Sequence, residues 1–373
     1  FRRVALKRCL AWILRRASQD GEAATDGLGA IFPPMVYIQI ALHALGWPRS
    51  DPVLRRAERD LDAFLVEQSE GDERWIMIQP CFSPVWDTGY ALTAMGRAGL
   101  AAGDPSVDAA TQWLLGKACA FRGDWADDVP IEPDALGWYF EYHNAWYPDV
   151  DDTAQVSMAL HATGDPTAMD AARRGVTWLL AMQNDEGGWA AFDRTRHRQI
   201  LEYVPFADHN AMQDPSCPDI TGRILECLAL HGYTTRDDVV QRALSYIRSC
   251  QTDDGAWIGR WGVNYIYGTW QALVGPIQCG VDPREAWVQR AVRWIRSIQH
   301  EDGSFGEKAD SYIDPAVKGI GPATASQTAW AALTLMACVG RDDEAVERAI
   351  TWLCESQLDA DSAADPARNP DGD

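Results

Sequence analysis

The stretch Arg174-Gly175-Val176-Thr177-Trp178-Leu179-Leu180-Ala181-Met182-Gln183, followed by Gly187-Gly188-Trp189, indicates the fold of this chain. Its aromatic and aliphatic residues recur at three and four positions, which gives a helix one apolar face. The Gly-Gly pair then ends the helix and turns the chain. We expect the Gln183 amide to reach backbone groups at the end of the next helix, and Trp189 to stack nearby.

The same unit recurs along the chain, and a second apolar helix follows each turn. Helix pairs of this kind close into a toroid or stack as a solenoid. The sequence therefore predicts an all-α fold, an α/α barrel (toroid) of repeated helix pairs with Gln-Trp repeat motifs. Further copies begin at Arg242, Arg290 and, without a closing aromatic residue, Arg348; weaker copies begin at Lys7, Leu61 and Ala109. The second helices are expected over residues 35–45, 88–98, 153–162, 221–230, 270–274 and 326–339.

Composition excludes several classes of partner. The chain of 373 residues carries a net charge of -21, which argues against nucleic acid and against a broad basic patch on anionic lipid. Its nine cysteines include no CxxC pair and no zinc spacing, so we expect reduced thiols. The most apolar stretch, Ala30 to Trp47, is interrupted by Pro33 and Pro34 and is not a membrane span. No signal peptide is visible, and the first residue is not Met, so we expect a partial chain.

Three carboxylates stand together in Tyr147-Pro148-Asp149-Val150-Asp151-Asp152-Thr153-Ala154, directly before an apolar run. One Asp can cap the free amides of a helix that begins here. Three like charges in one turn cannot all ionise cheaply, so at least one pKa should be raised. The motif is thus either an ordinary acidic helix start or a carboxylic acid kept protonated so that it can give its proton away.

Three further segments belong with the repeats and the acid motif. They are Ser83-Pro84-Val85-Trp86-Asp87-Thr88-Gly89, Gly259-Arg260-Trp261-Gly262-Val263-Asn264-Tyr265-Ile266-Tyr267-Gly268-Thr269 and Pro322-Ala323-Thr324-Ala325-Ser326-Gln327-Thr328-Ala329-Trp330. Together these segments resemble the squalene–hopene cyclase family of class II triterpene cyclases, over nearly the whole chain up to Gln357. The resemblance implies an isomerase without cofactor or metal, which protonates a terminal alkene of squalene and guides cationic polycyclisation to hopene-type products.

The same resemblance implies the domain organisation. Residues 1–58 are expected to be the end of a second α-barrel domain, and residues 59–357 the catalytic α/α-barrel domain. The composition of residues 358–373 offers almost nothing to bury, so this segment is expected to be a disordered acidic tail.

By resemblance, Asp151 is the proton donor, and Asp149 and Asp152 share its hydrogen bonds. The double acid Asp151-Asp152 resembles cyclases of plain squalene, since relatives that open an epoxide typically keep only the central Asp.

A second group is the pair Asp219 and Arg223, four residues apart on a helix expected to start near Pro218. Taken alone, such a pair is most simply a surface ion pair. By resemblance the cation at 223 steadies the acid motif after proton transfer, with Tyr267 near the acid. Many family members have His there, whereas Arg223 can stabilise charge but cannot relay a proton.

Aromatic faces stabilise carbocations, and nucleophilic side chains would trap them. By resemblance five aromatic residues line the substrate cavity, although each taken alone is more simply ordinary core. They are Trp86, Phe140, Phe192, Phe206 and Trp261.

Several alternatives stay open at this point. The acid motif could ligate Mg²⁺, although no second acidic cluster accompanies it. The chain could be a degenerate α-toroid that binds lipid or a partner, or a cyclase of another linear isoprenoid. The expected partners are squalene, the cytoplasmic face of a membrane through peripheral contact without a transmembrane span, and a second copy in a homodimer.

Overall fold

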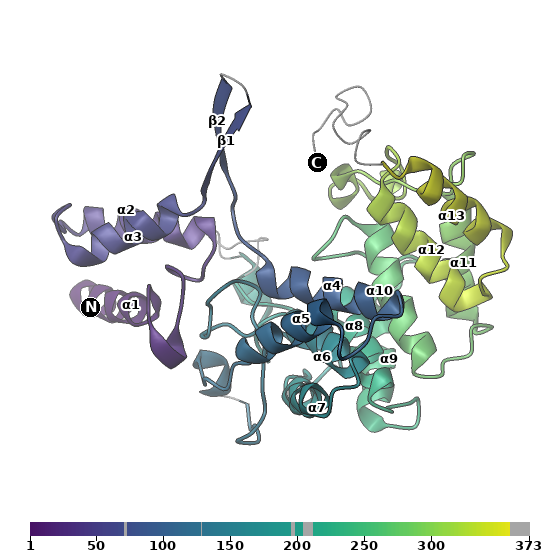
Figure 1. Cartoon of the computed structure of the whole chain (residues 1–373), viewed down its shortest axis with the longest axis horizontal. Helices are drawn as coiled ribbons and strands as arrows, with labels where there is room; N and C mark the ends of the chain where they lie inside the picture. The colour runs from purple at the N-terminus through teal and green to yellow at the C-terminus, as the bar shows by residue number, and fades with distance from the viewer. Residues whose placement is uncertain (71–72, 128, 195–197, 204–211, 359–373) are drawn as a thin grey trace. The chain divides into compact units, whose positions relative to one another are not determined.

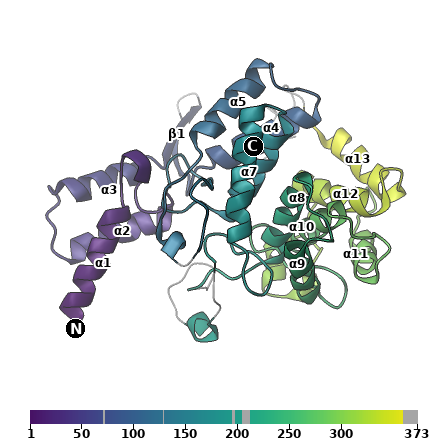
Figure 2. The same ribbon diagram turned by 90° about the horizontal axis from the view of Figure 1, so that it is seen from below.

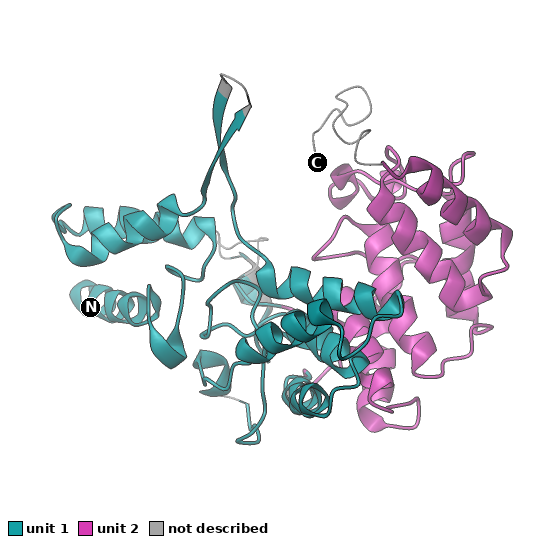
Figure 3. Ribbon diagram, viewed as in Figure 1, with its two compact units in different colours: residues 1–183, 190–214 teal, residues 184–189, 215–373 magenta. Residues whose placement is uncertain are grey.

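The computed structural model describes residues 1–70, 73–127, 129–194, 198–203 and 212–358. The predicted site residue Phe206 and nearly all of the predicted tail lie outside the described residues. Two compact units are present, and each is described by itself (Figure 3). Unit 1 comprises Phe1–Gln183 and Ala190–Asp214, and unit 2 comprises Asn184–Trp189 and Pro215–Asp373.

Helices dominate the described part of both units (Figure 1). In unit 1 they are α1 (Arg2–Arg16), α2 (Phe32–Ala44), α3 (Pro52–Asp62), α4 (Pro84–Arg97), α5 (Pro105–Gly116), α6 (Val150–Ala162) and α7 (Pro166–Ala181). In unit 2 they are α8 (Pro218–Leu230), α9 (Asp238–Ser249), α10 (Tyr265–Gln278), α11 (Ala286–Ser297), α12 (Ala325–Val339) and α13 (Glu344–Ser356). This confirms the predicted all-α class, and each helix predicted after a turn is present, with 270–274 extended to the whole of α10.

Local sequence explains where the alternate helices begin. Asp51, Asp104 and Asp165 each precede a proline, and each accepts a hydrogen bond from a backbone amide of the helix that follows. Proline at the first helical position loses no hydrogen bond, and the Asp side chain satisfies an amide that the helix leaves open. The Asp-Pro pairs therefore fix the starts of α3, α5 and α7.

A hairpin is the one departure from helix pairing in the described residues. Strands β1 (Leu65–Glu70) and β2 (Glu73–Ile78) pair antiparallel, with Gln68 opposite Trp75. The weak repeat copy expected from Leu61 is therefore wrong. The segment contains Gly-Asp between two runs with β-branched or aromatic residues, which favours strands joined by a turn over a helix.

The core of unit 1 lies among α4, α5, α6 and α7, which pack against one another (Figure 2). Trp138 is fully buried in this core, and its indole nitrogen donates to the carbonyl oxygen of Leu114 at 2.8 Å. The segment that contains Trp138 runs on to the acid motif, so the core holds one end of that loop in place.

In unit 2 the repeats link one helix pair to the next, as predicted for the Gln side chain. Gln251 Nε2 donates to the carbonyl oxygens of Gly255 at 3.0 Å and of Trp287, in α11, at 2.8 Å. Gln299 repeats the pattern, with 2.9 Å to Gly303 and 2.8 Å to Ala345 in α13. Trp257 closes its repeat, fully buried, with its ring edge against Trp287 at 6.0 Å between centroids.

The inner helices α8, α10 and α12 lie side by side, and two glycines allow the closest approach. A Cβ added at Gly222 would lie 1.9 Å from the backbone oxygen of Gln271, and one at Gly275 would lie 2.1 Å from the oxygen of Gly222. Neither neighbour is the flexible end of a side chain, so α8 and α10 can meet at this distance only with glycine.

Gly222→Ala is therefore expected to destabilise the protein by about 1–3 kcal/mol, because the two helices must separate. Gly96→Ala is the matched control, since Gly96 lies inside α4 with nothing within 4 Å of an added Cβ. That change should stabilise by about 0.5–1 kcal/mol. Urea denaturation of both variants measures the difference, and equal stability of the two would contradict the close contact.

Candidate active site

The acid motif forms the first turn of α6 in unit 1. Asp149 is the N-cap residue, and its Oδ1 accepts a hydrogen bond from the amide of Asp152 at 2.7 Å. Its own amide donates to the carbonyl oxygen of Trp138 at 2.9 Å. Thr153 Oγ1 donates to the Asp149 oxygen at 2.6 Å and accepts from the Trp138 amide at 2.9 Å. The Val150 amide donates to the oxygen of Ala191 at 2.7 Å, so the turn is held from several sides.

Burial changes the chemistry of these carboxyl groups. Asp149 is 5% exposed and Asp152 is 2% exposed, while Asp151 is half-buried with its Oδ1 atom fully buried. Burial raises the pKa of Asp149, and burial together with the charge of Asp149 raises the pKa of Asp152 well above its usual range. The motif is thus a helix cap and at the same time a buried acid pair with raised pKa values, and the role of Asp151 as proton donor stays a prediction.

Glu141 is a further buried carboxyl of unit 1, and sequence reasoning missed it. It is 7% exposed, and its Oε2 accepts a hydrogen bond from Asn144 Nδ2 at 3.0 Å. Burial is the main cause that raises the pKa of Glu141 to about 8, and the charge of Asp149 adds to it. No spacing rule marks this residue, but a single acid among the aromatic residues of Trp138 to Trp146 was a usable signal.

In unit 2 the pair Asp219 and Arg223 lies on α8, which begins at Pro218 as predicted. The interpretation of the pair as a surface ion pair is wrong, because Asp219 is 0% and Arg223 2% exposed. Asp219 Oδ2 accepts from the amides of Arg260 at 2.8 Å and Trp261 at 2.9 Å. The carboxylate therefore holds the loop that leads into α10.

Arg223 is surrounded by aromatic groups of the same unit. Its Nη2 donates to the hydroxyl of Tyr267 at 3.4 Å, and its guanidinium carbon lies 5.9 Å from the Trp270 ring centroid. Tyr267 contacts Trp270 and Trp330 edge-on, at 5.9 Å and 5.1 Å between centroids. The structure thus brings Arg223 and Tyr267 together, and the expected place of each near the acid motif stays a prediction.

A second carboxyl also supports α10. Glu307, which sequence reasoning did not single out, is 5% exposed, and its Oε2 accepts from the amide of Ile266 at 3.0 Å. Asp219 therefore holds the loop before α10, and Glu307 holds the first turn of α10, which carries Tyr267.

The predicted cavity aromatics are distributed over both units. Trp86 and Phe140 in unit 1 approach each other at 6.3 Å between centroids. Phe192, also in unit 1, is half-buried, and its amide donates to Asp214 Oδ2 at 2.6 Å. Trp261 in unit 2 is 40% exposed. Their contact with a substrate, like the approach of Asp151 to Arg223, stays a prediction.

Within the described ranges, no group of three or more His, Cys, Asp or Glu side chains is arranged to hold a metal ion. Among the same residues, none of the helices has the length and apolar character needed to cross a membrane.

The fold is that of the α/α toroids of class II terpene cyclases. The type II terpene cyclase MstE from Scytonema is similar to this chain with a TM-score of 0.50 and 18% identity, over 79% of this chain and 73% of that one. Family models then narrow the class. The squalene-hopene cyclase N-terminal domain matches residues 1–70, and the squalene-hopene cyclase C-terminal domain matches residues 82–372. The chain belongs to the squalene–hopene cyclase family.

Individual relatives agree with the family models. The squalene-hopene cyclase of Schizosaccharomyces japonicus is 44% identical over 343 residues, which are 90% of this chain and 51% of that protein. The squalene–hopene cyclase of Alicyclobacillus acidocaldarius is 41% identical over 361 residues, 96% of this chain and 56% of that protein. The chain spans about half the length of these curated relatives. The predicted boundary between residues 58 and 59 stays a prediction.

The buried acid at Glu141 predicts a pH dependence of stability. Its pKa rises from 4.5 to about 8 on folding, so the folded state holds a proton that the unfolded state has lost between these values. Stability from this group is therefore complete below about pH 4.5 and falls as pH rises towards about 8. Glu141→Gln should reduce the loss in the free energy of unfolding between about pH 4.5 and 8 by about 2 kcal/mol or more.

Urea denaturation across this pH range measures the slope. Glu58→Gln on α3, which replaces an exposed carboxyl, is the control and should leave the wild-type slope unchanged. If the Glu141 variant kept the wild-type slope, Glu141 would not be a buried acid in the folded protein.

Proposed function

We propose that this protein is a triterpene cyclase that protonates a terminal alkene of squalene and guides cationic polycyclisation to hopene-type products. The observation that carries the proposal is the buried, crowded carboxyl turn Asp149 to Asp152 in a member of this family. Squalene has no leaving group, so the reaction must begin with protonation of an unactivated alkene. That step needs a strong acid in a dry site, and a buried cluster of carboxyl groups can hold the proton for it.

Asp151 is the donor in this mechanism. Asp149 and Asp152 share hydrogen bonds with it and spread the charge that remains when the proton leaves. By the family resemblance, Arg223 is the cation that stabilises that charge, with the Tyr267 hydroxyl as its hydrogen-bond partner and Asp219 holding the loop before α10. The aromatic faces of Trp86, Phe140, Phe192, Phe206 and Trp261 then stabilise the successive carbocations without trapping them.

Asp151→Asn is expected to abolish turnover, by about 10³-fold or more, because the amide cannot deliver a proton. The purified protein is incubated with squalene in detergent, and polycyclic products are measured by gas chromatography. Asp170→Asn is the matched control, since Asp170 is an exposed carboxylate on α7 paired with Arg173. It should retain wild-type turnover.

Equal turnover by wild type and the Asp151 variant would remove Asp151 from the mechanism. Absence of turnover by wild type, with squalene binding retained, would instead favour the alternative of a degenerate α-toroid that binds lipid. Turnover of a different linear isoprenoid alone would keep the acid mechanism and change the substrate.

Squalene resides in bilayers, so we also propose peripheral contact with the cytoplasmic face of a membrane. Exposed apolar side chains of unit 1 support this contact. Tyr37 and Ile40, 67% and 59% exposed, share one face of α2, and Ile76 and Ile78 are exposed on β2.

A homodimer is a further proposal, which sedimentation velocity tests.

Replacing Tyr37 and Ile40 together by Ser should lower binding to neutral phosphatidylcholine vesicles by about tenfold, because apolar area is lost from the contact. Leu333→Ser on α12 removes an exposed apolar side chain of unit 2 and is the control. Vesicle flotation measures the bound fraction. Equal loss in both variants would point to unspecific adhesion.

A further inference from the structure

Glu141 lies beside the acid turn but does not belong to it. It follows Trp138 by three residues, and the backbone of Trp138 pairs with that of Asp149 in an isolated bridge. Asn144, which binds its carboxylate, is 3% exposed and is itself paired with Thr25 in a second bridge. The carboxyl group is therefore fixed in a loop whose far end is the acid motif.

The side chain of Glu141 also lines a cavity of about 270 Å³ in unit 1. Phe64, Phe82 and Tyr142 form an aromatic wall, with centroid distances of 5.7 Å and 6.3 Å between neighbours. A buried carboxyl thus lines a cavity, three residues from the strand bridge that joins Trp138 to Asp149 of the acid turn.

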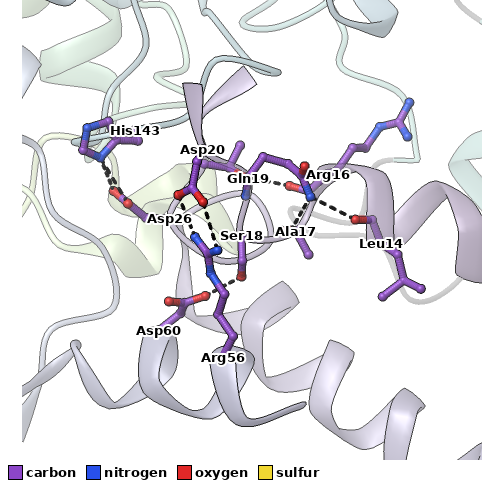
Figure 4. Close-up of polar contacts among 11 residues, drawn as sticks. Leu14, Arg16, Ala17, Ser18, Gln19, Asp20, Asp26, Arg56, Asp60 and His143 are labelled. Carbon is purple, nitrogen blue, oxygen red and sulfur yellow. Dashed lines mark hydrogen bonds and ion pairs between the residues drawn. The ribbon is translucent and has the colours of Figure 1, made fainter. Parts of the chain in front are cut away.

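Polar groups at the cavity are engaged by other partners (Figure 4). Asp26 is 49% exposed and contacts His143 Nδ1 at 3.2 Å, and Asp60 accepts a hydrogen bond from Ser18. Arg59 is the cation among the lining residues and is exposed. Of the three carboxyl groups that line this cavity, Glu141 is the buried one.

Two observations connect Glu141 to the acid turn. Burial is the main cause that raises the pKa of both Asp152 and Glu141, and the charge of Glu141 adds to the rise at Asp152, as the charge of Asp149 adds to the rise at Glu141. Asn144 Oδ1 and Asp152 Oδ1 are, in addition, buried acceptors for which the described residues supply no hydrogen-bond donor. Such acceptors are places where a water molecule or a protonated group binds. Among the described residues, the ionisable groups around Glu141 include Asp26, Arg59, Asp60, Cys81, Tyr139, Tyr142, His143, Asp149 and Asp152.

The proposed reaction consumes the donor's proton in every cycle, so the acid must be recharged. Arg223 cannot relay a proton, because a guanidinium does not give one up. We propose that Glu141 is a proton-relay residue, which takes a proton from water in the cavity and passes it to the ionised acid turn, restoring Asp151. This inference rests on the proposed function and concerns the same site.

The relay moves protons alone. Hydronium in the cavity protonates the Glu141 carboxylate, and the resulting carboxylic acid gives its proton to the carboxylate left in the turn. Each transfer breaks one O–H bond and forms another, and nothing is oxidised or reduced. A group whose pKa is about 8 is matched to this task, because it is readily protonated near neutral pH and can still release the proton.

The test separates the first turnover from later ones by rapid quench, with squalene in excess over enzyme. In Glu141→Gln the first turnover uses the proton already on the acid turn and should stay within about threefold of wild type. Steady-state turnover should fall about 100-fold, in the range of a lost proton-transfer group. Glu141→Asp, which restores a carboxyl, should recover part of the rate.

Controls make the outcomes distinct. Glu132→Gln, at an exposed position, should change neither phase, and Asp151→Asn should lose both. Circular dichroism checks that each variant is folded. If Glu141→Gln does not fold, Glu141→Asp is used in its place. A steady-state rate of Glu141→Gln within about threefold of wild type, or equal loss of first and later turnovers, overturns the relay alone. No product from wild type overturns the proposed function instead.

Discussion

The desolvation of carboxyl groups at the start of α6 is the constraint on which this structure depends. A buried carboxylate without compensation is costly, so such groups either keep their proton or receive strong hydrogen bonds. Here both happen within one turn. Asp149 accepts an amide hydrogen bond from Asp152 at 2.7 Å, and burial raises the pKa of both residues. Hydrogen bonds with the backbone of Trp138 and Ala191 and with the Thr153 hydroxyl hold the backbone of this turn.

In unit 2 the buried carboxylates are compensated by hydrogen bonds from backbone amides. Asp219 accepts from two backbone amides of the loop before α10, and Glu307 accepts from the amide of Ile266. These carboxylates accept hydrogen bonds from backbone amides, whereas the carboxyl groups of the acid turn are crowded, and burial raises the pKa of Asp149 and Asp152. One chain therefore contains buried acids that act as structural acceptors and buried acids with raised pKa values, on which the proposed proton transfer depends.

Sequence periodicity was enough to predict the helices and the role of Gln251 and Gln299, because each depends on neighbours within one or two turns. The hairpin at β1 and β2 was missed, since a weak match to the repeat outweighed its turn residues. Spacing alone could not decide whether Asp219 and Arg223 are buried, because the same separation occurs on solvated helices. Glu141 was missed for a related reason: its environment is built by α2, α3 and the loop before α4, which are distant in sequence.

The hydrogen bonds of Gln251 and Gln299 connect successive helices of unit 2 and so determine the order in which these helices unfold. Each amide bridges its own turn to the following outer helix, and Arg290 and Arg348 return a hydrogen bond to Gln251 and Gln299. In the described part of unit 2, α13 is the last helix that is hydrogen-bonded to such a glutamine. Unfolding of α13 would break the hydrogen bond between Gln299 and Ala345 and expose the face of α12 that packs against α13. Local unfolding should therefore spread from α13 towards α8. The rate of amide hydrogen exchange should accordingly increase from α8 to α13.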